Sequence, residues 1–172
     1  MRRSDRDRRF TQYVVARSPQ LTRTAYLLCG DPHRAEDLVQ IALTKLYLAW
    51  DRVDRSDTID AYVRQILVRA CIDESRRPWR RREVTDGQDR SGMPGKETEP
   101  QVESAVFAAL RALPPGQRAA VVLRYWNDLS VEETARLIGC SRSTVKTQAS
   151  RGLERLRAAL APTPSTSGAH DE

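Results

Sequence analysis

The stretch SVEETARLIGCSRSTVKTQASRGLERL (residues 130–156) predicts two helices joined by a tight turn. Ser130 stands three residues before Glu133, the spacing with which a hydroxyl and a carboxylate cap a helix start reciprocally. Gly139 suits the left-handed position that ends a helix, and Ser141 can cap a second helix. The apolar positions of the second helix follow helical spacing and are Val145, Ala149, Leu153 and Leu156. The segment is therefore predicted to be a helix-turn-helix.

Polar and basic side chains occupy the start of the second helix, as they do in a helix that enters a groove of DNA. The candidate DNA contacts are Arg142, Ser143, Thr144, Lys146, Thr147 and Arg151. No acidic residue lies between Ser141 and Gly152, so we expect no carboxylate to neutralise these cations. An ordinary αα-hairpin would use the same caps, and the segment by itself leaves that interpretation open.

The rest of the chain also predicts helices, and strand-type alternation appears nowhere. We expect a first helix from Phe10 to Leu28 that Pro19 interrupts or restarts. Asp31 and Pro32 are expected to begin a second helix that ends near Trp50. The remaining expected elements are a polar loop at 52–57, a third helix from about 58 to 77, a helix from about 102 to 113, and another at 117–126.

The fold class is therefore all-α, with two small helical domains joined by a flexible linker. The predicted domains are 10–82 and 102–160, the second of which contains the helix-turn-helix. Residues 83–101 contain three Gly and two Pro without apolar periodicity, which is typical of a linker. Residues 161–172 form a low-complexity tail that we expect to be disordered.

Charge is distributed in blocks along the chain. Residues 1–82 carry 18 basic and 11 acidic side chains, residues 83–101 carry 2 and 5, and residues 102–160 carry 9 and 5. Two basic blocks on either side of an acidic linker indicate a polyanion that is contacted at two separate places.

Several classes of protein are disfavoured. Cys29, Cys71 and Cys140 are widely spaced, and the chain has only two His, so we expect three buried thiols rather than a zinc site. Motifs for nucleotide binding, hydrolysis or metal catalysis are absent, so neither a cofactor nor enzyme activity is expected. The sequence has no membrane-spanning run and no signal peptide, which predicts a cytoplasmic protein.

Three segments in order resemble one known family, the bacterial RNA polymerase sigma factors of the sigma-70 family, and within it the extracytoplasmic-function (ECF) group. AEDLVQIALTKLYLAW (35–50) resembles the region 2 helix that docks on the polymerase clamp, and AYVRQILVRACIDESRRPWRR (61–81) resembles the segment that melts and reads the −10 element. Residues 113–129 with the helix-turn-helix resemble region 4, which binds the −35 element. The short spacing leaves no room for region 3, and no region 1.1 precedes Phe10; these absences indicate the ECF group.

The resemblance implies partners and site residues. Asp37 and Gln40 would face the clamp coiled coil of the polymerase, although Asp37 could also be a first-turn acid favoured by the helix dipole. The domain at 102–160 would also contact the polymerase flap. Arginines at the end of the third helix, around Trp79, would contact the −10 region through phosphates, although a solvated basic helix end would explain them nearly as well. The candidates for this region are Arg69, Arg76, Arg77, Arg80 and Arg81.

Arg69 departs from the family pattern, which usually has Asn at this position. A guanidinium cannot reproduce the paired donor and acceptor of an amide. The departure puts the usual −10 base contact in doubt.

The resemblance implies that the chain directs core polymerase to specific promoters and assists strand opening. Such proteins are often held by an anti-sigma factor, but no residue here identifies one. A stand-alone helix-turn-helix regulator and a protein-interaction adaptor are the alternatives.

Overall fold

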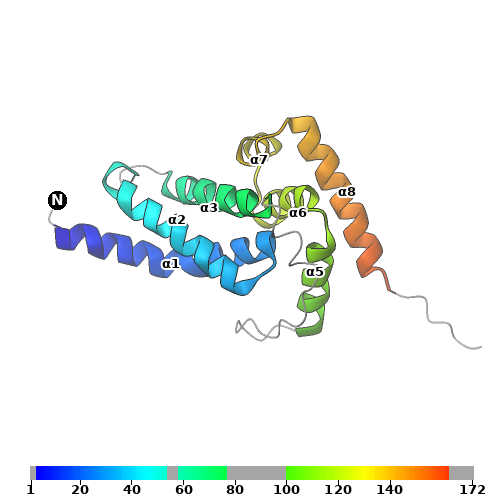
Figure 1. Ribbon diagram of the computed structural model, residues 1–172, viewed down its shortest axis with the longest axis horizontal. Helices are drawn as coiled ribbons and strands as arrows, with labels where there is room; N and C mark the ends of the chain where they lie inside the picture. The colour runs from blue at the N-terminus through cyan, green and yellow to red at the C-terminus, as the bar shows by residue number, and fades with distance from the viewer. Residues whose placement is uncertain (1–2, 54–57, 77–99, 163–172) are drawn as a thin grey trace, which may run out of the picture.

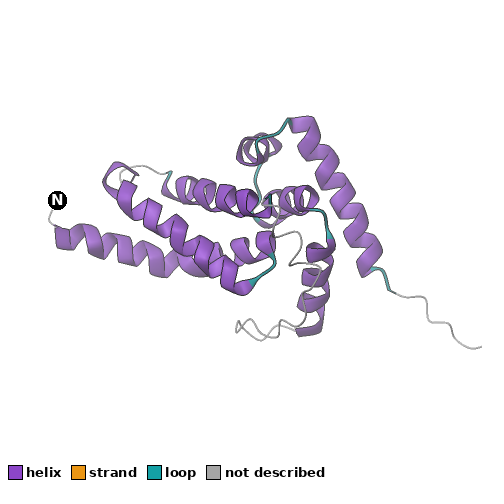
Figure 2. Cartoon of the chain, viewed as in Figure 1, coloured by secondary structure: helices purple, strands orange, loops and turns teal. Residues whose placement is uncertain are grey.

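The computed structural model describes residues 3–53, 58–76 and 100–162, and every regular element in these ranges is a helix (Figure 2). The all-α class is confirmed. The first three helices are α1 (Arg3–Cys29), α2 (Pro32–Val53) and α3 (Ile59–Ser75). The others are α5 (Pro100–Ala112), α6 (Pro115–Val121), the π-helix η2 (Val122–Trp126), α7 (Val131–Ile138) and α8 (Arg142–Leu160).

Helices α1, α2 and α3 lie side by side as an elongated bundle (Figure 1). Asp31 caps α2 as predicted, because its Oδ1 accepts hydrogen bonds from the backbone N–H groups of His33 at 2.9 Å and Arg34 at 3.3 Å. Trp50 is only 2% exposed, and the rings of Phe10 and Tyr13 pack against it. The sequence thus places α2 at the centre of the bundle, where its apolar face is covered from both sides.

The prediction for α1 is wrong in two respects. The helix passes through Pro19 without a break, and it begins at Arg3 rather than near Phe10. The early start is stabilised from α2, because Arg6 donates hydrogen bonds to the Tyr47 carbonyl at 2.7 Å and to Asp51 at 3.0 Å. Packing of the flanking turns on the bundle outweighs the hydrogen bond that proline cannot make.

The second unit contains α5 to α8, with α8 on its outer side (Figure 1). The predicted helix at 117–126 is divided in two, since α6 continues into the π-helix η2. Helix α8 crosses α6 closely at Gly152, where an added Cβ would lie 2.7 Å from Val121 Cγ2 and 3.3 Å from the Gln117 carbonyl oxygen. This glycine allows the backbones of the two helices to approach each other.

The two units touch directly. The rings of Tyr26 in α1 and Phe107 in α5 stack with centroids 4.0 Å apart, and the Arg23 guanidinium lies 5.1 Å from the centre of the Trp126 ring. Buried apolar side chains form one continuous core that extends from α1–α3 into α5 and α6. The predicted domain limits remain a prediction, because residues 77–99 and 163–172 lie outside the described ranges and include most of the linker and tail.

The three thiols are free, but the expectation that all are buried is wrong. Cys71 is buried, whereas Cys29 and Cys140 are partly exposed. Burial raises the pKa of the Cys71 thiol, which stays protonated. Within the described ranges, no helix combines the length and apolar character needed to span a bilayer.

Candidate nucleic-acid interface

The start of α7 has the predicted capping box. The backbone N–H of Ser130 donates to Glu133 Oε2 at 2.9 Å, and the backbone N–H of Glu133 donates to Ser130 Oγ at 3.1 Å. The hydrogen bond from the Ser130 backbone to the Glu133 carboxyl is the largest cause that lowers the pKa of this carboxyl. Two orphan donors at the helix start are satisfied together, which fixes where α7 begins.

The turn between α7 and α8 also matches the prediction. Gly139 has a φ of +78°, and the N–H groups of Gly139 and Cys140 donate to the Ala135 carbonyl at 2.9 and 3.1 Å. Ser141 Oγ then accepts from the N–H of Thr144 at 3.1 Å and caps α8. The helix-turn-helix is therefore confirmed as a local structure.

Helix α8 presents different residues to the core and to solvent. Val145 is 1% exposed and Ala149 is buried, while Leu153 and Leu156 are partly buried against the core. The predicted DNA contacts all lie on the exposed surface of α8: Arg142, Ser143, Thr144, Lys146, Thr147 and Arg151. One rigid helix thus brings all six together, with hydroxyls between the cations.

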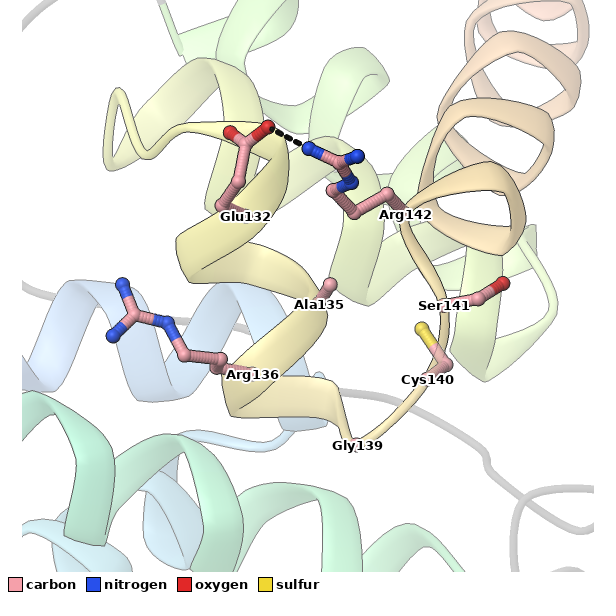
Figure 3. Close-up of a pocket in the computed structure, with 7 residues that line it drawn as sticks. All are labelled: Glu132, Ala135, Arg136, Gly139, Cys140, Ser141 and Arg142. Atoms are coloured by element: carbon pink, nitrogen blue, oxygen red, sulfur yellow. Dashed lines mark hydrogen bonds and ion pairs between the residues drawn. The ribbon is translucent and has the colours of Figure 1, made fainter.

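The expectation that no carboxylate neutralises these cations is wrong. Arg142 Nη1 donates to Glu132 Oε1 at 3.0 Å, across the turn from α7 (Figure 3). A hydrogen bond to its own backbone lowers the pKa of the Glu132 carboxyl first, and the Arg142 guanidinium lowers it further. The prediction considered only residues 141–152 and so missed Glu132, which lies ten residues before Arg142.

Two of the predicted −10 residues lie in the other unit, on α3 and at its end. Arg69 and Arg76, on α3 and at its C-terminal end, are exposed. Arg77, Arg80 and Arg81 lie outside the described residues, and so does Trp79. The structure therefore places two of the five candidates on an accessible surface and does not test the rest.

The predicted polymerase contacts lie on the exposed side of α2. Asp37 and Gln40 are both exposed, on the side opposite the buried Leu38 and Leu46. Two large apolar side chains that the sequence reasoning missed extend this surface: Ile41 is 46% exposed and Leu48 is 78% exposed. Their spacing from Asp37, four and eleven residues, puts them on the same helical side, which could have indicated them.

Comparisons with known proteins give a single family. The model described as Sigma-70 region 2 matches residues 13–81, and the model described as Sigma-70, region 4 matches residues 104–156. The RNA polymerase sigma-E factor of Streptomyces coelicolor is 35% identical over 155 residues, which cover 88% of this chain and 85% of that protein. The ECF RNA polymerase sigma factor EcfG of Rhodopseudomonas palustris is 31% identical over 151 residues, covering 86% of this chain and 82% of EcfG.

Solved structures agree with this result. The sigma factor RpoE of Bartonella quintana, solved with the anti-sigma factor NepR, is 28% identical and superposes with a TM-score of 0.67 over 88% of this chain and 96% of RpoE. CnrH, solved with the cytosolic domain of CnrY, shares the fold at 23% identity and a TM-score of 0.59, covering 90% of this chain and 88% of CnrH. With both regions matched in order and relatives aligned over most of their length, this chain belongs to the sigma-70 family of RNA polymerase sigma factors, in the extracytoplasmic-function group.

Proposed function

We propose that this sigma factor contacts the −35 promoter element through the exposed surface of α8 when it directs core RNA polymerase to a promoter. The observation that carries this assignment is the set of six exposed polar and basic side chains on α8, five of them within its first six residues, while Val145 among them is buried. Arg142, Lys146 and Arg151 can neutralise phosphates or reach guanine, and the hydroxyls between them can bond to base edges. Such a helix reads the major groove from its N-terminal end.

The exposed side of α2 is the proposed contact with the clamp coiled coil of core polymerase. Asp37 and Gln40 offer polar groups, and Ile41 and Leu48 offer apolar area beside them. Stable protein interfaces combine an apolar centre with a polar rim, and an exposed carboxylate can meet basic groups of a partner. The flap of the polymerase is the proposed partner of the unit that contains α5 to α8.

Helix α3 and the arginines that follow it are the proposed −10 surface. Arg69 and Arg76 are accessible for phosphate contact, and Arg77, Arg80 and Arg81 are assigned from sequence alone. Opening of strands without ATP requires that unpaired bases be held by stacking and by hydrogen bonds to their edges. Arg69, in place of an amide, favours a different base preference at this element.

The protein performs no bond chemistry of its own in this proposal and acts in the cytoplasm, where it joins core polymerase. An anti-sigma factor is a proposed further partner, because the related RpoE was solved with one.

Run-off transcription with core polymerase over a genomic promoter library tests the proposal. We expect initiation at a small set of promoters that share one −35 and one −10 sequence. The alternative of a stand-alone regulator predicts specific binding to DNA without core polymerase, whereas two small separated surfaces bind weakly alone. Strong specific binding by the isolated protein without transcription would therefore contradict the proposal. Tight protein binding with neither DNA contact nor transcription would instead indicate an adaptor.

A further inference from the structure

The corner between α7 and α8 contains an ion pair within the proposed DNA surface. Glu132 is the second residue of α7 and Arg142 is the first of α8, and both line a shallow groove of about 410 Å³ with Ala135, Gly139 and Ser141 (Figure 3). In Figure 3 the two side chains point toward each other across the top of this groove. A carboxylate therefore lies where a DNA-binding surface would otherwise be purely cationic.

The two adjacent glutamates of α7 have different partners. Glu133 closes the capping box with Ser130, so its role is structural. Glu132 takes no part in that box, and its carboxylate accepts from Arg142 and is also near the positive charge of Lys146. Arg142 and Lys146 are four residues apart and so lie on one side of α8. Glu132 thus faces both cations of the first turns of the proposed reading helix.

Stability does not explain the Glu132–Arg142 pair. The side chains of Arg142 and Glu132 are 67% and 57% exposed, and ion pairs this open to solvent contribute little to folding. A carboxylate near DNA also repels phosphates, which reduces sequence-independent affinity. The main effect of the pair is therefore on the orientation of the Arg142 guanidinium.

The pair leaves the rest of the guanidinium free. Arg142 uses Nη1 for Glu132, while its other nitrogens are the donors that an arginine needs for the O6 and N7 of guanine. A flexible arginine would otherwise divide its time between base edges and phosphates, and a phosphate contact carries no sequence information. A carboxylate on one side of the fork disfavours the phosphate and shifts the planar group toward one of its orientations.

We propose that Glu132 is a positioning residue that aims Arg142 at a guanine of the −35 element, which lowers overall affinity for DNA and raises specificity. The inference rests on the proposed assignment of α8 as the −35 reader. Glu132 contacts no base in this scheme and acts only through Arg142.

The test uses the full chain with core polymerase and a promoter library randomised over the −35 element. Glu132→Gln keeps the shape and removes the charge, and Glu133→Gln is the matched control because glutamine still completes a capping box. For Glu132→Gln we expect the guanine preference at one −35 position to fall on the order of fivefold, at the lower end of what a bidentate arginine–guanine pair provides. Binding to non-specific DNA should tighten, and the plot of log K against log salt should steepen by about 0.9, equivalent to one more phosphate contact.

Arg142→Ala, alone and with Glu132→Gln, tests two claims separately. The first is that Arg142 reads the −35 element, and the second is that Glu132 positions Arg142. We expect Arg142→Ala to abolish the same base preference and Glu132→Gln to have no further effect on it in that background. If Arg142→Ala leaves the −35 preference unchanged, the assignment of Arg142 as a −35 reader fails, and the inference fails with it. If Arg142→Ala matters while Glu132→Gln behaves like Glu133→Gln, only the inference is overturned. A change in base preference caused by Glu132→Gln in the absence of Arg142 would mean that Glu132 acts on a base itself or through Lys146, and either outcome contradicts the positioning of Arg142.

Discussion

The side-chain amide of Asn127 donates a hydrogen bond to the hydroxyl of Thr24, 3.2 Å away, although 103 positions separate them in sequence. Thr24 is 2% exposed and Asn127 is partly buried, so the contact is shielded from solvent on the side of Thr24. It joins the unit of α1–α3 to the unit of α5–α8, as the stacked rings of Tyr26 and Phe107 also do. The region 2 and region 4 units of this sigma factor therefore contact each other through specific side chains.

Removing the stacked ring should weaken the contact between the two units. For Phe107→Ala we expect a longer mean distance between probes attached at the exposed Val15 and Leu160, because an aromatic pair contributes about 0.5–1.5 kcal/mol beyond its buried area. Energy transfer between two fluorophores measures this distance. Val106→Ala, at the exposed neighbouring position, is the control and should leave the distance unchanged. Equal distances in the two variants would mean that the stack does not hold the units together.

Charge reversal on the exposed side of α2 should weaken binding to core polymerase. Asp37→Lys replaces an accessible carboxylate beside Ile41 and Leu48 with a cation, so an electropositive partner surface would be repelled. We expect at least a tenfold loss of core affinity in a fluorescence anisotropy titration, corresponding to about 1.4 kcal/mol. Asp73→Lys makes the same change at an exposed position of another helix, α3. Similar losses for both would contradict a specific contact at Asp37.

An added methyl group at Gly152 should destabilise the protein. Its Cβ would lie 2.7 Å from Val121 Cγ2, and a buried β-branched side chain cannot easily move away. We expect Gly152→Ala to lower the free energy of unfolding by about 1–3 kcal/mol despite the better helix propensity of alanine. Urea denaturation measures the change. Gly116→Ala in α6 is the control, since the nearest atoms to its Cβ would belong to the Gln148 side chain, at 3.4 Å or more.

Because of the hydrogen bond of Tyr13, the free energy of unfolding should fall as the pH rises through the alkaline range. Its hydroxyl donates to Asp60 Oδ1 at 2.8 Å, and burial, followed by this hydrogen bond, raises the pKa of the Tyr13 phenol above its ordinary value. Below the unfolded-state pKa of about 10 both states keep the proton, so the stabilisation is complete. As the pH rises toward the folded-state pKa, the unfolded state loses the proton first and unfolding becomes easier.

Tyr13→Phe should therefore lose less stability than the wild type between about pH 8 and about pH 11, on either side of the ordinary phenol pKa. At the lower pH the variant should be less stable by about 1 kcal/mol, because the Asp60 contact is gone. Urea denaturation at the two pH values provides the comparison, and Tyr125→Phe, at an exposed position, is the control. A parallel decline of wild type and Tyr13→Phe would argue against this role for Tyr13.

Local features were the ones that the sequence could predict. The capping box of Ser130 and Glu133, the left-handed Gly139 and the cap by Ser141 each depend on residues within a few positions, and all three are confirmed. Side-chain assignments on α8 followed from its apolar period alone. The exposure of the residues proposed to contact DNA could therefore be predicted from the sequence alone.

The features that were missed depend on long-range packing. The Glu132–Arg142 pair spans a turn, the Thr24–Asn127 bond spans most of the chain, and neither leaves a periodic pattern. Pro19 was expected to break α1 because propensity disfavours proline inside a helix, but tertiary contacts override propensity. The π-helix after Val121 has no compositional signal at all.

The close crossing at Gly152 has a mechanical consequence for α8. Arg142 lies ten residues before this crossing, which is about 15 Å along the helix at 1.5 Å per residue. A tilt of about 10° around the crossing would move the start of α8 by about 2–3 Å. This displacement is similar to the donor–acceptor distance of a hydrogen bond, so it is large enough to break one. Packing at Gly152 thus helps to set the direction of α8, and with it the position of the proposed base contacts at the start of the helix. A methyl group added at Gly152 would therefore move the Arg142 side chain relative to the DNA, although Gly152 itself contacts no DNA in this scheme.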